Sequence, residues 1–146
     1  MALSELLYLS SEEEYKKYFI ENYCKVSPIA TFDGLPVVFY PEMFEHAFYK
    51  RAKASWHAPK DSLDRERCKR MRWIKNVLND DSIIPRQGYD KARNRYHNSR
   101  RVAFLAPNDY IVVIRKAGAT WRFVTAYVID NERTKKKILS SPAWHS

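Results

Sequence analysis

The pattern of apolar and polar residues is clearest between residues 110 and 130. Residues 110–114 form an almost unbroken run of β-branched and aromatic side chains, and residues 121–129 form a second run. Runs of this composition are typical of buried strands. Gly118 lies between them and adopts a positive φ without strain, so the pattern predicts a β-hairpin.

The length of the turn sets the register that we expect in this hairpin. With residues 118 and 119 in the turn, Arg115 should lie opposite Arg122. The same register places Val112 opposite Thr125, although a slip of one residue would exchange the two faces. Arginines at the solvated end of a hairpin are common, so the hairpin alone does not indicate a function.

Several elements are predicted in the N-terminal third of the chain. A capping box at residues 10–14 opens a helix over residues 12–24, whose shared face should carry Tyr15, Tyr18, Phe19 and Asn22. Two short strands, residues 29–32 and 37–40, flank an Asp-Gly turn. Pro41 then opens a short helix.

After a loop over residues 51–62, a second long helix is predicted, with Asp61 or Ser62 as its cap and an end near Leu78. Its apolar positions follow the i, i+3, i+4, i+7 rule at Leu63, Met71, Ile74 and Leu78. The other face is basic, with few acids to pair with Arg65, Arg67, Lys69, Arg70, Arg72 and Lys75. A solvated face and an anion-binding face are equally consistent with this pattern.

Less regular sequence follows. Residues 82–97 are predicted to be irregular, residues 101–105 to form a strand and residues 132–139 to form a helix. Trp144 is expected to pack back onto the body of the protein.

These elements predict an α+β fold, in which N-terminal helices pack on a small, mostly antiparallel sheet of four or five strands. We expect a single domain over residues 1–146. Within it, an acidic helix (residues 1–24) is appended to a main body (residues 25–146).

Charge adds a functional indication. The formal net charge is +9, but residues 1–46 contain 3 Lys/Arg and 8 Asp/Glu, a balance of −5. Residues 47–146 contain 23 Lys/Arg and 9 Asp/Glu, a balance of +14. Positive charge at this density repels itself, so an anionic partner would stabilise the fold, and nucleic acid is the leading candidate.

Other classes are disfavoured. The sequence has no apolar run long enough for a transmembrane helix, and its N-terminus lacks the basic start of a secretory signal. Cys24 and Cys68 have no companion at metal-site spacing, so we expect two reduced thiols in a cytoplasmic protein. Glycine-rich phosphate loops are absent and the histidines lack metal-ligand spacing, so we expect neither a cofactor nor a metal.

Cations and aromatic residues alternate in the segment from residue 86 to residue 101. This mixture suits single-stranded nucleic acid, because phosphates need charge and unstacked bases need a flat surface. A poorly ordered basic loop would have the same composition. The predicted RNA-binding set comprises Arg51, Arg70, Arg72, Tyr89, Lys91, Arg93, Arg95, Arg115 and Lys116.

The same residues could support metal-free cleavage of RNA. This reaction needs a group that takes the 2′-hydroxyl proton, a cation for the developing phosphorane and an acid for the leaving oxygen. His46 immediately precedes the basic part of the chain, and histidine titrates near neutral pH. Charge can come from Arg115, Lys116 and Arg122, and a hydrogen bond from Thr125 or Tyr127. A histidine that merely pairs with Glu42 or Glu45 is the structural alternative.

Five segments carry a family resemblance: FEHAFYKR with His46 and Arg51, MRWIKNVLNDDSII, RRVAFL, YIVVIR…WRFVTAYVID, and KILSSPAW. In order and spacing, over residues 29–144, they resemble the barnase–EndoU–colicin–RelE-like (BECR) ribonuclease fold, especially its phage-associated PBECR branch. The resemblance implies metal-independent RNA cleavage, often by toxins or phage effectors. It also implies that His46 is the acid/base residue, that Arg122 faces the scissile phosphate, and that Thr125 and Tyr127 lie at the site.

The leading hypothesis is therefore a cytoplasmic, metal-independent endoribonuclease acting on structured RNA or transfer RNA. An acidic antitoxin or immunity protein would be a further partner, and no membrane partner is expected. Two alternatives stay open, namely a non-catalytic nucleic-acid-binding module and a basic domain that docks an acidic protein. The former predicts salt-sensitive binding without cleavage, and the latter predicts no competition by RNA.

Overall fold

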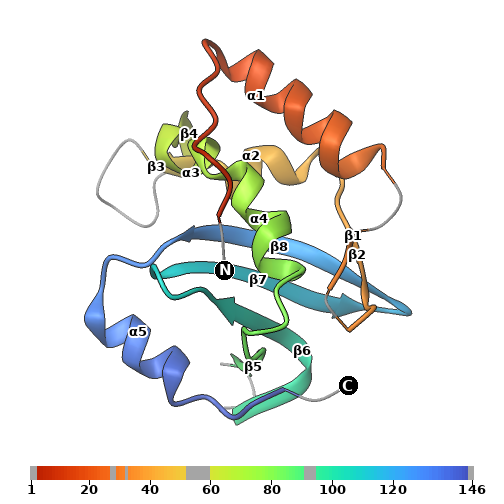
Figure 1. The fold of residues 1–146 in the computed structure, drawn as a ribbon, viewed down its shortest axis with the longest axis vertical. Coiled ribbons are helices and arrows are strands. Elements are labelled where there is room, and N and C mark those ends of the chain that lie inside the picture. The colour runs from red at the N-terminus through yellow and green to blue at the C-terminus, as the bar shows by residue number, and fades with distance from the viewer. Residues whose placement is uncertain (1–2, 27–28, 32, 52–59, 91–94, 145–146) are drawn as a thin grey trace.

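The computed structural model describes residues 3–26, 29–31, 33–51, 60–90 and 95–144. Within these residues the chain has the predicted α+β class. Helices α1 to α4 lie on one side of a twisted sheet, and α5 lies at its other side (Figure 1). None of the described helices is long and apolar enough to cross a lipid bilayer.

The main sheet of the described chain has six strands in the order β1-β2-β8-β7-β6-β5, more than the four or five predicted. Adjacent strands in this sheet run antiparallel, except β2 and β8, which run parallel to each other. Strands β3 and β4 form a separate two-stranded sheet. The strands are β1 (Ile29–Ala30), β2 (Pro36–Val38), β3 (Tyr49–Arg51), β4 (Lys60–Leu63), β5 (Arg86–Asp90), β6 (Arg95–Leu105), β7 (Tyr110–Ala117) and β8 (Thr120–Val128).

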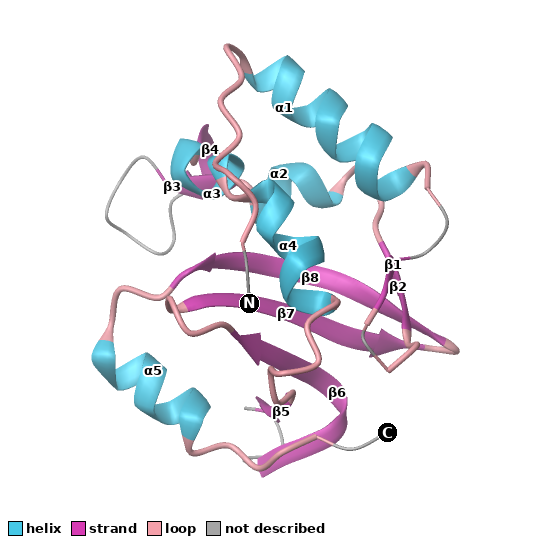
Figure 2. Cartoon of the chain, in the orientation of Figure 1, coloured by secondary structure: helices cyan, strands magenta, loops and turns pink. Residues whose placement is uncertain are grey.

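The helices are short, and Figure 2 shows that α1 continues directly into η1 as one helical ribbon. Most of them gather on the side of the sheet that faces the main hydrophobic core. They are α1 (Glu12–Phe19), the π-helix η1 (Ile20–Cys24), α2 (Met43–Ala47), α3 (Arg65–Lys69), α4 (Met71–Leu78) and α5 (Glu132–Leu139).

Helix α1 begins where the capping box predicts. The Ser11 hydroxyl accepts a hydrogen bond from the Glu14 N–H at 3.2 Å, and the Glu14 carboxylate accepts one from the Ser10 N–H at 3.0 Å. These bonds satisfy backbone donors that the first turn leaves unpaired.

The end of this helix differs from the prediction. In η1 the Lys25 N–H donates to the Ile20 carbonyl, a wider turn than that of an α-helix. One buried face carries residues spaced by four, namely Tyr15 and Phe19 of α1 and Tyr23 of η1. Asn22 is exposed, so its predicted place on that face is wrong. The acidic helix thus contributes aromatic side chains to the main core.

The predicted continuous helix over residues 62–78 is also wrong. Its first residues belong to β4, which pairs with β3 where a loop was expected, and residues 52–59 lie outside the described chain. Asp64 is the cap, because its side chain accepts a hydrogen bond from the Arg67 N–H at 3.2 Å. The helix then breaks at Arg70, which separates α3 from α4.

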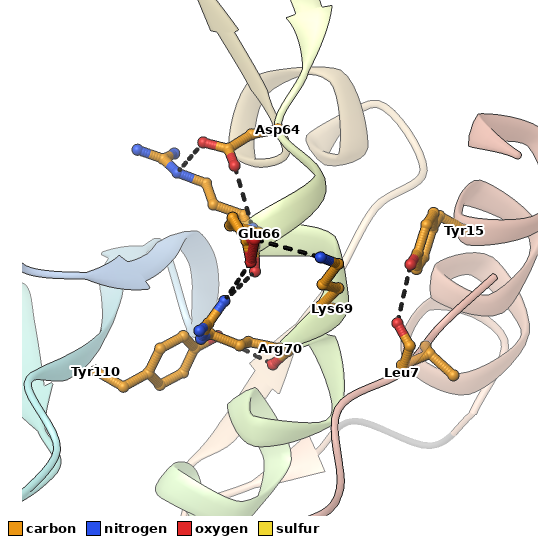
Figure 3. A network of polar contacts seen from close by, with 8 residues as sticks. Leu7, Tyr15, Asp64, Glu66, Lys69, Arg70 and Tyr110 are labelled. Carbon is orange, nitrogen blue, oxygen red and sulfur yellow. Dashed lines mark hydrogen bonds and ion pairs between the residues drawn. The ribbon is translucent and has the colours of Figure 1, made fainter. Parts of the chain in front are cut away.

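Distant donors explain this break. The Lys69 carbonyl accepts from the Leu7 N–H at 2.8 Å, and the Met71 carbonyl accepts from the Tyr23 hydroxyl at 2.5 Å. Between them, the Arg70 carbonyl faces the Tyr110 hydroxyl at 3.3 Å (Figure 3). Three consecutive carbonyls therefore accept from groups elsewhere in the chain, and the Arg70 carbonyl also accepts from the nearby Trp73 N–H at 2.9 Å, so the interruption leaves none of them unpaired.

The β7–β8 hairpin confirms most of the predicted register. Arg115 lies opposite Arg122, and Gly118 occupies the turn with a φ of 65°. A β-bulge at Val124 then shifts the ladder, so Thr125 lies opposite Val113. The predicted pairing of Thr125 with Val112 is wrong, because sequence spacing does not reveal an extra residue in one strand.

The segment predicted to be irregular contains strands. Gln87 pairs with Val102, and Tyr89 pairs with Tyr96, so β6 is much longer than the predicted strand over residues 101–105. The C-terminal segment supports β5, because the Trp144 N–H donates to the Pro85 carbonyl at 2.8 Å. As predicted, Trp144 packs back and is buried.

Candidate nucleic-acid interface

Register aligns three arginines on the adjacent strands β6, β7 and β8, near the turn of the β7–β8 hairpin. Arg101 of β6 pairs with Arg115 of β7, and Arg115 pairs with Arg122 of β8. Arg122 in turn pairs with Val38 of β2. We call Arg101, Arg115 and Arg122 the arginine row. For Arg101 the structure gives the backbone position only.

Burial shows which side of the sheet the row faces. Side chains alternate between faces along a strand. Val112 and Ile114 belong to the main core under the helices, whereas Ile111 belongs to a second cluster near α5. Arg115 lies four positions after Ile111 on β7, so the two side chains point to the same face. Arg115 and its partner Arg122 therefore face away from helices α1 to α4.

The bulge at Val124 places two hydroxyl residues on the same face. Thr125 lies opposite Val113, and Tyr127 lies opposite Ile111. In a regular strand, Thr125 would face the opposite side from Arg122, because three residues separate them. The bulge therefore unites Arg122, Thr125 and Tyr127, three of the four residues predicted to be catalytic.

Positive charge on this face is weakly compensated. Arg115 is exposed, and Arg122 is partly buried with its guanidinium 5.2 Å from the centroid of the Tyr40 ring. The Nε of Arg122 is buried without a hydrogen-bond partner, and in the described chain neither guanidinium pairs with a carboxylate. Like charges directly opposite in a ladder are destabilising, so this arrangement favours a bound anion.

His46, the fourth predicted catalytic residue, comes from the other side of the sheet. It is exposed on α2, whose Phe44 belongs to the main core. Phe48, just after the helix, stacks on Phe123 in the same core. Helix α2 therefore packs on the helical side, whereas Arg122 faces the opposite side.

Two cations of the predicted RNA-binding set already have partners in the protein. Arg70 donates to the Glu66 carboxylate at 3.2 Å, and Arg72 donates to the Tyr18 hydroxyl at 3.3 Å. Lys116 is exposed, but it lies opposite Trp121, on the face of the hairpin opposite to that of Arg115 and Arg122.

The rest of that set lies in strands β3, β5 and β6 or outside the described residues. Lys91 and Arg93 lie outside the described residues. Arg51 ends β3, Tyr89 lies in β5 and Arg95 begins β6, and the description of these three residues stops at the backbone.

A cavity of about 520 Å³ opens where α3 meets the end of β8. Figure 3 shows Glu66 in this region held by Lys69 and Arg70, whose hydrogen bonds lower the pKa of its carboxyl below the ordinary value. Sequence reasoning missed the cavity, because residues 62–78 were predicted as one helix with a basic outer face. The remaining lining comes from β8 and the segment after it, including Tyr127 and Asp130.

Comparisons of the chain with family models, curated proteins and solved structures gave no match. The resemblance to BECR ribonucleases therefore stays a prediction. Among the described residues, the His, Cys, Asp and Glu side chains form no group of three or more that could hold a metal ion.

Proposed function

We propose that this chain binds single-stranded RNA across the arginine row. One observation carries the proposal: three arginines occupy consecutive cross-strand positions, and Arg115 and Arg122 lack a carboxylate partner in the described chain. Phosphates would neutralise this charge, and counterion release would add to the affinity.

Aromatic residues near the row favour an unpaired strand over a duplex. Tyr40 stacks with the guanidinium of Arg122, and Tyr127 lies further along the same face of β8. Unstacked bases bind to such rings and to arginine planes, whereas bases within a duplex are not accessible to them.

Salt-dependent binding tests this proposal. We expect Arg115→Gln and Arg122→Gln each to weaken binding of a single-stranded RNA and to reduce the salt slope by roughly 0.7, the value for one lost phosphate contact. Lys116→Gln is the matched control, because it removes a neighbouring charge from the other face. Equal weakening by all three substitutions would indicate a general charge effect and would contradict the role of the row.

A second function, metal-independent cleavage of the bound RNA, is favoured by the bulge. It places the hydroxyls of Thr125 and Tyr127 on the same face as Arg122. Arginine can stabilise the charge of a phosphorane, and a tyrosine hydroxyl can transfer a proton. In this arrangement Tyr127 takes the acid/base role on the sheet, whereas His46 of α2 lies on the other side of the sheet from Arg122.

Incubation of RNA with the protein in excess EDTA tests cleavage. We expect fragments that end in 2′,3′-cyclic phosphate, and a loss of roughly 10²-fold or more when the proton-transferring residue is replaced. Comparing Tyr127→Phe with His46→Ala assigns that role. RNA that is shifted in a gel but stays intact would leave binding as the function.

A further inference from the structure

The cavity beside the end of β8 has a mixed lining. It contains three carboxylates, two guanidinium groups and one phenol, supplied by Asp64, Glu66, Asp130, Arg67, Arg70 and Tyr127. Its volume of about 520 Å³ lies within the range of small-molecule sites. Because both signs of charge line it, a ligand that both donates and accepts hydrogen bonds fits it best.

The two arginines are held in place by the protein. The Nε of Arg67 lies 3.4 Å from the Asp64 carboxylate, and its Nη1 donates to the Ala47 carbonyl at 3.1 Å. The Nη1 of Arg70 donates to the Glu66 carbonyl at 2.8 Å, and the guanidinium lies 5.2 Å from the centroid of the Trp73 ring. The site is therefore preorganised, which lowers the entropic cost of binding.

Two groups of the lining keep hydrogen-bonding capacity. The Nε–H of Arg70 is buried and lacks a partner among the described residues. A buried donor that stays unsatisfied destabilises the protein, so a ligand acceptor that reaches it would recover the missing hydrogen bond. Asp130 is exposed and has no ion-pair partner within the described chain, so its carboxylate can accept from a ligand donor.

Tyr127 supplies a flat surface. The guanidinium of Arg67 lies over this ring, 4.8 Å from its centroid, in a cation–π contact. Nucleobases stack on aromatic rings and on arginine planes, and they carry donors and acceptors on one edge. A free phosphate fits less well, because the carboxylates in the lining outnumber the guanidinium groups.

We propose that this cavity binds one unstacked nucleobase of the RNA held by the arginine row. The base would stack on the Arg67–Tyr127 pair, accept from Arg70 and donate to Asp130. Tyr127 connects the two sites, because it shares the ladder face of Arg122, lies four ladder positions further along β8, about 13 Å, and at that end of the strand its ring contacts Arg67 of α3. The assignment of a nucleobase to this cavity rests on the proposed binding of RNA by the arginine row.

Free ribonucleosides test the cavity separately from the phosphate contacts, because they carry no phosphate. We expect the four ribonucleosides, observed by ligand-detected NMR, to include at least one that binds with little dependence on salt. Asp130→Asn should weaken this binding at least about tenfold, since the amide loses the negative charge and one of the two acceptor oxygens of the carboxylate. Asp81→Asn, an exposed aspartate outside the cavity, is the matched control and should bind like the wild type.

Three results would contradict the inference. Salt-sensitive RNA binding without any nucleoside binding would overturn the base site and leave the proposed function intact. Equal nucleoside binding by Asp130→Asn and the wild type would move the site away from this cavity. Nucleoside binding by a protein that does not bind RNA would overturn both the proposed function and the assignment to a base of RNA.

Discussion

Arg115 and Arg122 lie directly opposite each other in the β7–β8 ladder, on the side of the sheet away from helices α1 to α4. In the described chain no carboxylate separates or pairs with them. The pair therefore lowers the stability of the free protein while preparing a surface for an anion. Stability and binding should respond in opposite directions when one arginine is removed.

We expect Arg115→Gln to raise the free energy of unfolding in low salt by roughly 0.2–1 kcal/mol, because it removes a like-charge cross-strand pair. The gain should shrink as salt screens the repulsion in the wild type. Urea unfolding at two salt concentrations measures it. Lys116→Gln is the control, since Lys116 lies opposite Trp121, and a stabilisation of equal size there would refute the repulsion.

The tyrosine hydroxyls at the α3–α4 break should be important for stability. Tyr23→Phe leaves the Met71 carbonyl without the buried donor that it has at 2.5 Å, and should cost about 1–3 kcal/mol in urea unfolding. Tyr110→Phe should cost less, because its bond to the Arg70 carbonyl is longer at 3.3 Å. Tyr8→Phe, on a side chain that is 68% exposed, should have little effect. Equal stabilities for the three variants would contradict the role of these bonds.

The contribution of Glu66 should depend on pH. Hydrogen bonds from Arg70 and Lys69 make its pKa lower in the folded chain than in the unfolded chain. Its stabilising effect is therefore present above the ordinary glutamate pKa of about 4.3 and is lost as the pH falls through the lower, folded value.

Glu66→Gln should consequently reduce the free energy of unfolding near neutral pH. In strong acid it should not, because the Glu66 carboxyl is then protonated and uncharged, like the amide that replaces it. Urea unfolding at both pH values measures the difference. In a background of Arg70→Gln and Lys69→Gln the same substitution should change little at either pH, because its partners are gone. A loss of stability that is constant with pH would show that the ion pairs are not responsible.

Trp144→Ala should destabilise the protein by about 3–5 kcal/mol, as expected for truncation of a buried aromatic side chain. Trp144 is 7% exposed, and its ring meets Trp121 edge-to-face at 5.3 Å between centroids. Thermal unfolding measures the loss, with the exposed Pro142→Ala as control. If the two variants unfold at the same temperature, the C-terminal segment does not support the core.

Local sequence signals predicted the elements that depend on local contacts. The turn at Gly118 fixed the near part of the hairpin, and the acids after Ser11 fixed the start of α1. Local signals failed where distant partners decide the structure. The break at Arg70 depends on Leu7, Tyr23 and Tyr110, which supply donors from other parts of the chain.

The same distinction applies to the candidate interface. Charge and composition indicated a polyanion partner and included Arg115, Arg122, Thr125 and Tyr127 among the predicted residues. Their common face could not be derived from the spacing, because it depends on the bulge. The cavity was missed, because its lining joins α3 to a segment about sixty residues later, at residues 127–130.

The extra residue at Val124 has a consequence for comparing this chain with relatives. A chain that lacked Val124 would continue from Phe123 directly to Thr125 with regular alternation, and both residues would keep their faces. Strand β8 can therefore be one residue shorter at this point while the side chains on either side of the bulge keep their faces of the sheet. In an alignment, Arg122 and the Thr125–Tyr127 triplet are two separate blocks, and a gap of one position between them is compatible with the same surface.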